Sequence, residues 1–138
     1  MESPVLPSSL SPLQPIFPQA YQRNAHRIAL PYLNRTILLS VDDIVSLQGE
    51  GNYTYLFTRD KKRYLVSKTL KAFETSLNEL MFLRIHKSTI VNLGYVQFES
   101  LIPDRMIRLT DGQEVSISRR RAKEIGQRLQ SFRMTLVN

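Results

Sequence analysis

From residue 27 onwards, apolar, aromatic and β-branched residues occur in short runs that are separated by turn-forming residues. Such runs are typical of strands, and two of them that flank Asn34 predict a β-hairpin. The predicted strands, of which the last two are joined by an Asp111–Gly112 turn, are RIALPYL, RTILLS, DIVSLQ, YTYLFT, RYLVS, FLRIHKSTIVNL, YVQFESLI, RMIRLT and EVSIS. Because these strands do not alternate with helices in βαβ units, the sequence predicts a mainly β fold.

Two segments have helical periodicity instead. TLKAFETSLNEL begins at Thr69 as an N-cap and carries apolar residues at helical spacing, namely Leu70, Phe73, Leu77 and Leu80. SRRRAKEIGQRLQSF begins at Ser118 as an N-cap, and its apolar face consists of Ala122, Ile125, Leu129 and Phe132. We therefore expect two short helices beside the strands.

The first part of the chain differs in composition from the rest. Residues 1–26 hold most of the seven prolines and show neither helical nor strand periodicity, which predicts a flexible tail or linker. Its Ile16, Phe17 and Tyr21 could still dock onto a surface. We expect a single domain over residues 27–138.

The charge of the chain restricts its partners. The 19 lysines and arginines exceed the 12 aspartates and glutamates, and residues 1–26 contribute only Glu2 and Arg23. The basic domain thus favours a polyanionic partner, nucleic acid before membrane, although a net charge of +7 also keeps a small protein in solution.

Few residues could support catalysis or a metal site. The chain has no cysteine and two histidines, and in GEGNYT Thr54 stands where a dinucleotide-binding loop needs its third glycine. We expect no enzymatic activity, no metal and no cofactor. The absence of cysteine and of a bilayer-length apolar run favours the cytoplasm.

Two segments place cations where stability alone does not explain them. In FLRIHKSTIVN, Arg84, His86 and Ser88 share one face of an extended strand, a row of donors that suits phosphate groups. The alternative is a core histidine with satisfied hydrogen bonds.

In SISRRRAKEI, three arginines in a first helical turn oppose the helix dipole at ~0.3–1 kcal/mol each, which suggests a phosphate or base-edge site. The alternative there is a solvated charge run.

These two segments, together with GEGNYTYLFT, resemble the LytTR domain, a DNA-binding output module of bacterial response regulators in two-component systems. The resemblance covers roughly Arg27 to Leu129 and rests on four blocks, which are DIVSLQGEGNYTYLFT, SKTLKAFE, FLRIHKSTIVNLGYV and LTDGQEVSISRRRAKEI. It implies a stack of small, mainly antiparallel sheets with one or two short helices. It also implies that loops enter the major groove of duplex DNA and bind specific sequences.

The resemblance also implies roles for single residues. Candidates for contacts with bases are Asn52, Tyr53, Thr54, Lys87 and Arg120. Candidates for contacts with phosphates are Lys68, Arg84, His86, Ser88, Ser118, Arg119 and Arg121. Asn92 is expected to support the loop behind His86. Arg and Lys suit guanine O6 and N7, and Asn suits adenine N6 and N7.

The family likeness further predicts how the protein is used. We expect two copies on repeated half-sites about one helical turn apart, with weak dimerisation in the absence of DNA. Relatives carry an upstream receiver domain or a membrane segment, whereas here a proline-rich stretch precedes the domain. We therefore expect transcription regulation without a receiver domain of its own, either by the protein alone or with a separate sensor protein.

Two other functions stay open at this point. A basic β module could bind single-stranded DNA or RNA by stacking bases on Tyr53, Tyr55 and Phe57, although we expect those rings to form a buried face of the sheet. Alternatively, the domain could be a protein-interaction adaptor that has lost DNA binding and recruits a partner through its tail.

Overall fold

The computed structural model describes residues 27–98 and 106–136, and the structural statements below concern those residues. The predicted proline-rich tail, and with it Ile16, Phe17 and Tyr21, lies outside the described residues. So does the later part of the strand predicted in YVQFESLI. Its first residue, Tyr95, is the last residue of a 3-10 turn, η2 (Leu93–Tyr95), and its second, Val96, forms an isolated bridge to Leu109.

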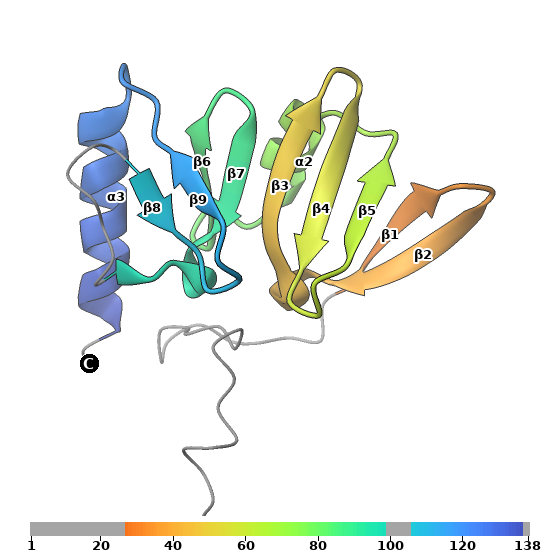
Figure 1. Ribbon diagram of the computed structural model, residues 1–138, viewed down its shortest axis with the longest axis horizontal. Coiled ribbons are helices and arrows are strands. Elements are labelled where there is room, and N and C mark those ends of the chain that lie inside the picture. Colours follow the sequence, from red (N-terminus) through yellow and green to blue (C-terminus); the bar gives the residue numbers. More distant parts are fainter. Residues whose placement is uncertain (1–26, 99–105, 137–138) are drawn as a thin grey trace, which may run out of the picture.

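A five-stranded antiparallel sheet forms the centre of the domain (Figure 1). Its strands, in the spatial order β5-β4-β3-β7-β6, are β5 (Arg63–Val66), β4 (Tyr53–Thr58), β3 (Ile44–Glu50), β7 (Thr89–Asn92) and β6 (Phe82–His86). β3 and β7 pair although 38 residues separate Glu50 from Thr89 along the chain. This pairing brings the two hairpins, β3–β4 and β6–β7, side by side.

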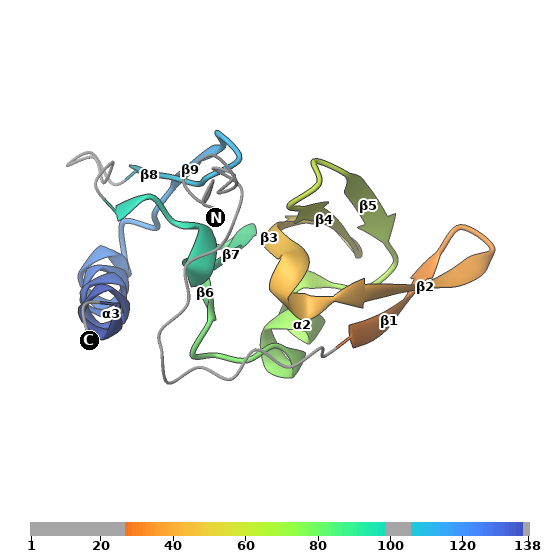
Figure 2. The same cartoon turned by 90° about the horizontal axis from the view of Figure 1, so that it is seen from below.

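Two hairpins and two helices flank this sheet (Figures 1 and 2). The hairpin of β1 (Arg27–Tyr32) and β2 (Arg35–Ser40) lies beyond β5, and that of β8 (Met106–Arg108) and β9 (Glu114–Ser116) lies beyond β6 and β7. The first helix, α2 (Leu70–Ser76), lies against β3, where a Cβ added to Gly49 would come within 3.3 Å of Leu70. The second, α3 (Ala122–Thr135), covers the outer side of β8 and β9.

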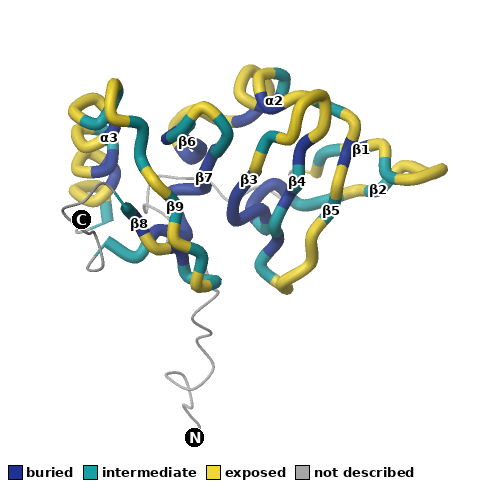
Figure 3. The backbone as a smooth tube through the Cα atoms, turned by 45° about the horizontal axis from the view of Figure 1, so that its top comes forward, coloured by how far each residue is buried: buried dark blue, intermediate teal, exposed yellow. Residues whose placement is uncertain are grey.

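The buried apolar residues form one core cluster, and Figure 3 colours the backbone segments to which they belong. Core residues that are less than 1% exposed come from both hairpins of the central sheet, α2, η2, β8 and α3, and include Leu47, Leu56, Phe73, Ile85, Val91, Tyr95, Ile107 and Ile125. The Tyr95 hydroxyl donates to the Asp42 carbonyl at 2.6 Å, in the 3-10 turn η1 (Val41–Asp43). The core therefore joins the central sheet to the β8–β9 side of the domain.

The prediction of small antiparallel sheets with two short helices is confirmed, and so is the Thr69 cap, whose hydroxyl accepts from Ala72 N–H at 3.1 Å. The predicted end of that helix is wrong. The helix ends at Ser76, and Leu80 lies beyond it with 65% of its surface exposed. An Asn78 side chain that accepts from Leu80 N–H at 2.8 Å holds this stretch in a turn.

FLRIHKSTIVNL was predicted as one strand, and this is wrong. The segment forms two antiparallel strands, β6 and β7, with Lys87 and Ser88 at the turn between them. Within the turn, the Ser88 backbone N–H donates to His86 Nδ1 at 3.2 Å, a local hydrogen bond that favours a turn over a continuing strand. Ser88 therefore does not continue a row of donors along a strand.

The predicted start of the last helix is also wrong. Ser118 is not its cap, because the Ser118 N–H donates to the Ile85 carbonyl at 2.7 Å and thereby holds this segment in extended form beside β6. The helix begins at Ala122 with Arg121 in the N-cap position and no side-chain cap. The three arginines consequently precede the helix, and the dipole argument does not apply to them as a first turn.

Candidate nucleic-acid interface

Three connections lie at the same end of the domain (Figure 1). They are the β3–β4 turn at Gly51–Asn52, the β6–β7 turn at Lys87–Ser88, and the segment 117–121 between β9 and α3. We call this end of the domain the turn edge. Parts of three of the four sequence blocks that carry the family resemblance therefore lie together at this edge.

Backbone hydrogen bonds fix the three parts of the turn edge to one another. Gly49 N–H donates to the Ser88 carbonyl at 2.8 Å, so the end of β3 lies beside the β6–β7 turn. The Ser118 N–H donates to the Ile85 carbonyl, so the segment before α3 lies on the other side of that turn. The order of the parts is therefore set by the sheet and not by flexible loops.

At the β3–β4 turn, Gly51 has a φ of 62°, a left-handed conformation that glycine adopts without strain. Asn52 and Tyr53 are exposed next to it. Thr54 is different, because it is 0% exposed and its hydroxyl donates to the Lys68 carbonyl at 2.6 Å. The structure thus contradicts the expectation that Thr54 contacts bases.

At the β6–β7 turn, the side chain of Lys87 is exposed and His86 and Ser88 are half-buried. Besides accepting from the Ser88 N–H, His86 Nδ1 lies 3.0 Å from the Ser88 hydroxyl. Because Nδ1 is an acceptor here, the neutral ring carries its proton on Nε2. His86 therefore keeps one donor for a ligand outside the turn.

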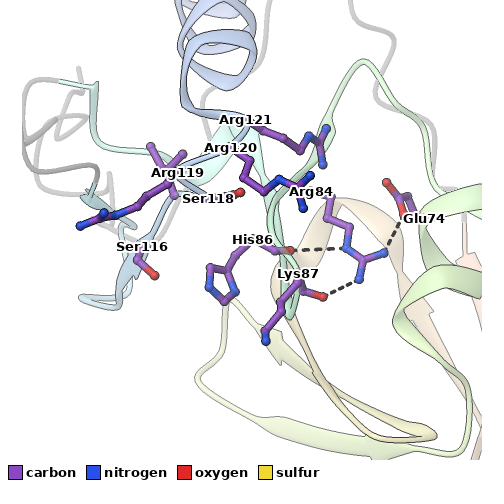
Figure 4. A pocket seen from close by; sticks show the side chains of 10 residues that line it. Glu74, Arg84, His86, Lys87, Ser116, Ser118, Arg119, Arg120 and Arg121 are labelled. Carbon is purple, nitrogen blue, oxygen red and sulfur yellow. Dashed lines mark hydrogen bonds and ion pairs between the residues drawn. The ribbon is translucent and has the colours of Figure 1, made fainter.

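Arg84 lies behind this turn and is engaged by the protein (Figure 4). Its Nη1 lies 2.9 Å from Glu74 Oε1 of α2, its Nη2 donates to the Lys87 carbonyl, and its Nε donates to the His86 carbonyl at 3.4 Å. The arginine therefore connects α2 with the β6–β7 turn. Sequence reasoning missed Glu74, since no local signal ties residue 74 to residue 84.

A groove of about 1000 Å³ separates the β6–β7 turn from the segment before α3 (Figure 4). Its cationic lining residues are Arg84, Lys87, Arg119, Arg120 and Arg121, and Glu74 is the one carboxylate among the described residues that line it. Ser116, Ile117, Ser118 and His86 complete the lining. The groove is therefore a basic surface with polar donors on both walls.

The three arginines differ in their surroundings. Arg119 and Arg120 are exposed, and Arg120 points toward the β6–β7 turn whereas Arg119 points the opposite way (Figure 4). Arg121 pairs with Glu124 at 3.3 Å. Within residues 27–98 and 106–136, no ion pair involves Lys87, Arg119 or Arg120.

Two predicted residues lie away from the groove. The Lys68 ammonium sits 4.8 Å from the centre of the Phe73 ring, in the connection between β5 and α2. Asn92 is 1% exposed, donates to the Ile44 carbonyl at 2.9 Å and accepts from Gly94 N–H at 2.9 Å. Asn92 therefore ties β7 to β3 and η2, at the end of β7 that is remote from His86, and does not support the turn as expected.

The aromatic residues of β4 are less buried than expected. Thr54, Leu56 and Thr58 form the buried face of this strand, while Tyr53 is 48% exposed and Tyr55 and Phe57 are half-buried. The Tyr55 and Phe57 rings lie 6.4 Å apart, and the Arg63 guanidinium lies 5.0 Å from the centre of Tyr55. An aromatic strip thus begins next to the β3–β4 turn.

Among residues 27–98 and 106–136, no three His, Cys, Asp or Glu side chains are grouped as a metal site would require. In the same residues, neither helix has the length and apolar character needed to cross a bilayer.

Comparison with known proteins gives one consistent family. The LytTr DNA-binding domain matches residues 34–130. The heme-containing CO-sensing transcriptional regulator RcoM 1 of Paraburkholderia xenovorans is 36% identical over 110 residues, which are 78% of this chain and 41% of that protein. The sensory transduction protein LytT of Bacillus subtilis is 30% identical over 105 residues, 72% of this chain and 42% of LytT.

A solved LytTr DNA-binding domain from Bacillus cereus has the same fold, with a TM-score of 0.65 and 21% identity over 75% of this chain and 95% of that one. The chain spans less than half the length of RcoM 1 and LytT.

Proposed function

Because the chain belongs to the LytTR family of DNA-binding domains, we propose that its turn edge binds duplex DNA sequence-specifically through the major groove. The observation that carries this proposal is the common position of three connections, each of which presents an exposed polar side chain. Asn52, Lys87 and Arg120 are these side chains. All three are of the types that recognise purine edges.

The proposed contacts with bases come from Asn52, Lys87 and Arg120, with Tyr53 beside them. Each well-formed base contact discriminates between base pairs by about 1–3 kcal/mol. Thr54 is left out because it is buried. Lys87 and Arg120 both line the groove, one from the β6–β7 turn and the other from the segment before α3, which supports a joint approach to one DNA segment.

Phosphate contacts are proposed for residues around these side chains and for Lys68, which lies away from the groove. Arg119 is exposed without an ion pair to other described residues, and His86 has Nε2–H available as a donor. The other proposed donors are Lys68, Ser88, Ser118 and Arg121. If about six phosphates are neutralised, affinity should fall by roughly three orders of magnitude from 50 to 200 mM salt.

A biological role of the domain follows from this proposed DNA binding. We infer that the domain regulates transcription, has no catalytic activity, and binds repeated half-sites as two copies that associate weakly without DNA. A sensor, either on a separate protein or elsewhere in a longer chain, would control it. The family to which the domain belongs supports the DNA-binding part of this proposal.

Selection of bound fragments from a random duplex pool tests the proposal. The purified protein should enrich one repeated motif, and a gel shift should then show preference for that duplex over either of its single strands. The aromatic strip of exposed Tyr53 and half-buried Tyr55 and Phe57 favours single-strand binding as a second candidate. Equal or better binding of the single strands would support that candidate and contradict the proposal.

A further inference from the structure

The guanidinium of Arg84 lies between a helix and the turn that presents Lys87. It contacts Glu74 Oε1 at 2.9 Å on one side and the carbonyls of His86 and Lys87 on the other. We propose that Arg84 and Glu74 form a brace that positions the β6–β7 turn for DNA, and that Arg84 itself contacts no phosphate. This inference rests on the proposed function of the turn edge.

The contacts of Arg84 leave it little capacity for DNA. Each of its three side-chain nitrogens has a partner within the protein, and only 23% of the side chain is exposed. The neighbouring Glu74 carboxylate would repel a phosphate at this place. Arg84 therefore differs from Lys87, Arg119 and Arg120, which line the same groove without ion pairs to other described residues.

The brace transmits the rigidity of the core to the tip of the turn. The helix α2 is held by the buried side chains of Leu70 and Phe73 and by its Thr69 cap. Glu74 extends from this helix to Arg84, and Arg84 fixes the two carbonyls that flank the α-carbon of Lys87. The direction in which the Lys87 side chain leaves the turn is thereby restricted, and a contact with a base edge requires such restriction.

DNA binding by Glu74→Ala and Arg84→Ala tests the brace, with Arg108→Ala as the matched control. Arg108 forms an exposed pair with Glu114 in the β8–β9 hairpin, at 2.5 Å. For each brace variant, the ratio of affinities for the selected duplex and a scrambled duplex should fall by about tenfold, because Lys87 is misplaced. Arg108→Ala should leave this ratio unchanged.

The competing roles give different results. If Glu74 only repels DNA, Glu74→Ala would raise the affinity for both duplexes and leave the ratio as it was. If Arg84 binds a phosphate, Arg84→Ala would lower both affinities and reduce the slope of log K against log salt by about one. The brace predicts an unchanged salt slope for Arg84→Ala. It also predicts that the double variant has the same affinity ratio as either single variant, because both substitutions remove the same contact.

Amide exchange measured without DNA separates the brace from the proposed function. In both brace variants, the amides of residues 87–89 and of Gly49, which donates to the Ser88 carbonyl, should exchange faster than in the wild type. Unchanged exchange together with an unchanged affinity ratio would overturn the brace and leave the proposed function intact. Faster exchange in a protein that selects no duplex would support the brace and overturn the proposed function.

Discussion

The backbone N–H of Ser88 donates to Nδ1 of His86 at 3.2 Å, and this bond closes the turn that carries Lys87. The two ring nitrogens of His86 thus have different roles. Nδ1 accepts within the turn, and in the proposed interface Nε2–H donates to DNA.

Substitutions of His86 should separate these roles. Asparagine can accept from a backbone N–H two residues later, so His86→Asn should keep the turn and lose the outer donor. His86→Ala should lose both, and its free energy of unfolding should fall by about 0.5–1.5 kcal/mol. Urea unfolding measures the stability, and a gel shift should show weaker binding of the selected duplex by both variants. Equal loss of stability in both variants would contradict the role of Nδ1.

Removal of Lys87 and Arg120 together should abolish selective binding while the fold persists. Each side chain is exposed without an ion pair to other described residues, so truncation to alanine leaves no buried group unsatisfied. A gel shift with selected and scrambled duplexes and a thermal melt measure the two effects.

Arg133→Ala is the control for this double variant, because Arg133 is an exposed arginine in the last turn of α3, far along the helix from the turn edge. It should keep the preference for the selected duplex. An adaptor protein would instead keep its activity in cells when Lys87 and Arg120 are both replaced.

Local sequence signals predicted the β1–β2 and β8–β9 hairpins and one helix boundary well, but not the β6–β7 hairpin. Asn34 marks the β1–β2 turn, Asp111–Gly112 lies between β8 and β9, and Thr69 caps α2, because each of these features depends on residues close in sequence. Gly112 has a φ of 95°, a conformation that the hairpin signal anticipates.

Contacts between distant residues were not predictable in this way. Ser118 would be an ordinary N-cap by its local sequence, but its N–H bonds to Ile85 and the helix starts later. Arg84 has the residue type and strand position of a phosphate ligand, but its guanidinium contacts Glu74, which no local sequence signal predicts. The three segments of the candidate site could be named from sequence, but their common edge depends on the pairing of β3 with β7.

Asn92 should be important for stability and not for DNA binding. Its side chain is buried and satisfies both the Ile44 carbonyl and the Gly94 N–H. Asn92→Ala leaves these two groups unpaired, so the free energy of unfolding should fall by about 2–4 kcal/mol. Urea unfolding checks the loss. At a temperature where the variant is folded, an altered salt slope of DNA binding would contradict a purely structural role.

Gly126 offers a stabilising substitution. It lies inside α3, and a Cβ added there would meet no atom within 4 Å. Gly126→Ala should therefore raise the free energy of unfolding by about 0.5–1 kcal/mol, because alanine loses less backbone entropy in a helix. Gly112→Ala is the matched opposite, since a φ of 95° strains any residue with a Cβ and stability should fall. A thermal melt distinguishes the two, and a loss of stability in Gly126→Ala would contradict the open environment.

Lys68 tests whether the interface extends beyond the groove. Its ammonium lies over the Phe73 ring, in the connection between β5 and α2, and it reads no base in the proposed arrangement. Lys68→Ala should weaken selected and scrambled duplexes alike and reduce the salt slope by about one, because one phosphate contact is lost. Affinity measured across a salt series checks both effects. If the slope stays the same, the contact of Lys68 with Phe73 is structural only, and the phosphate-binding surface ends at the turn edge.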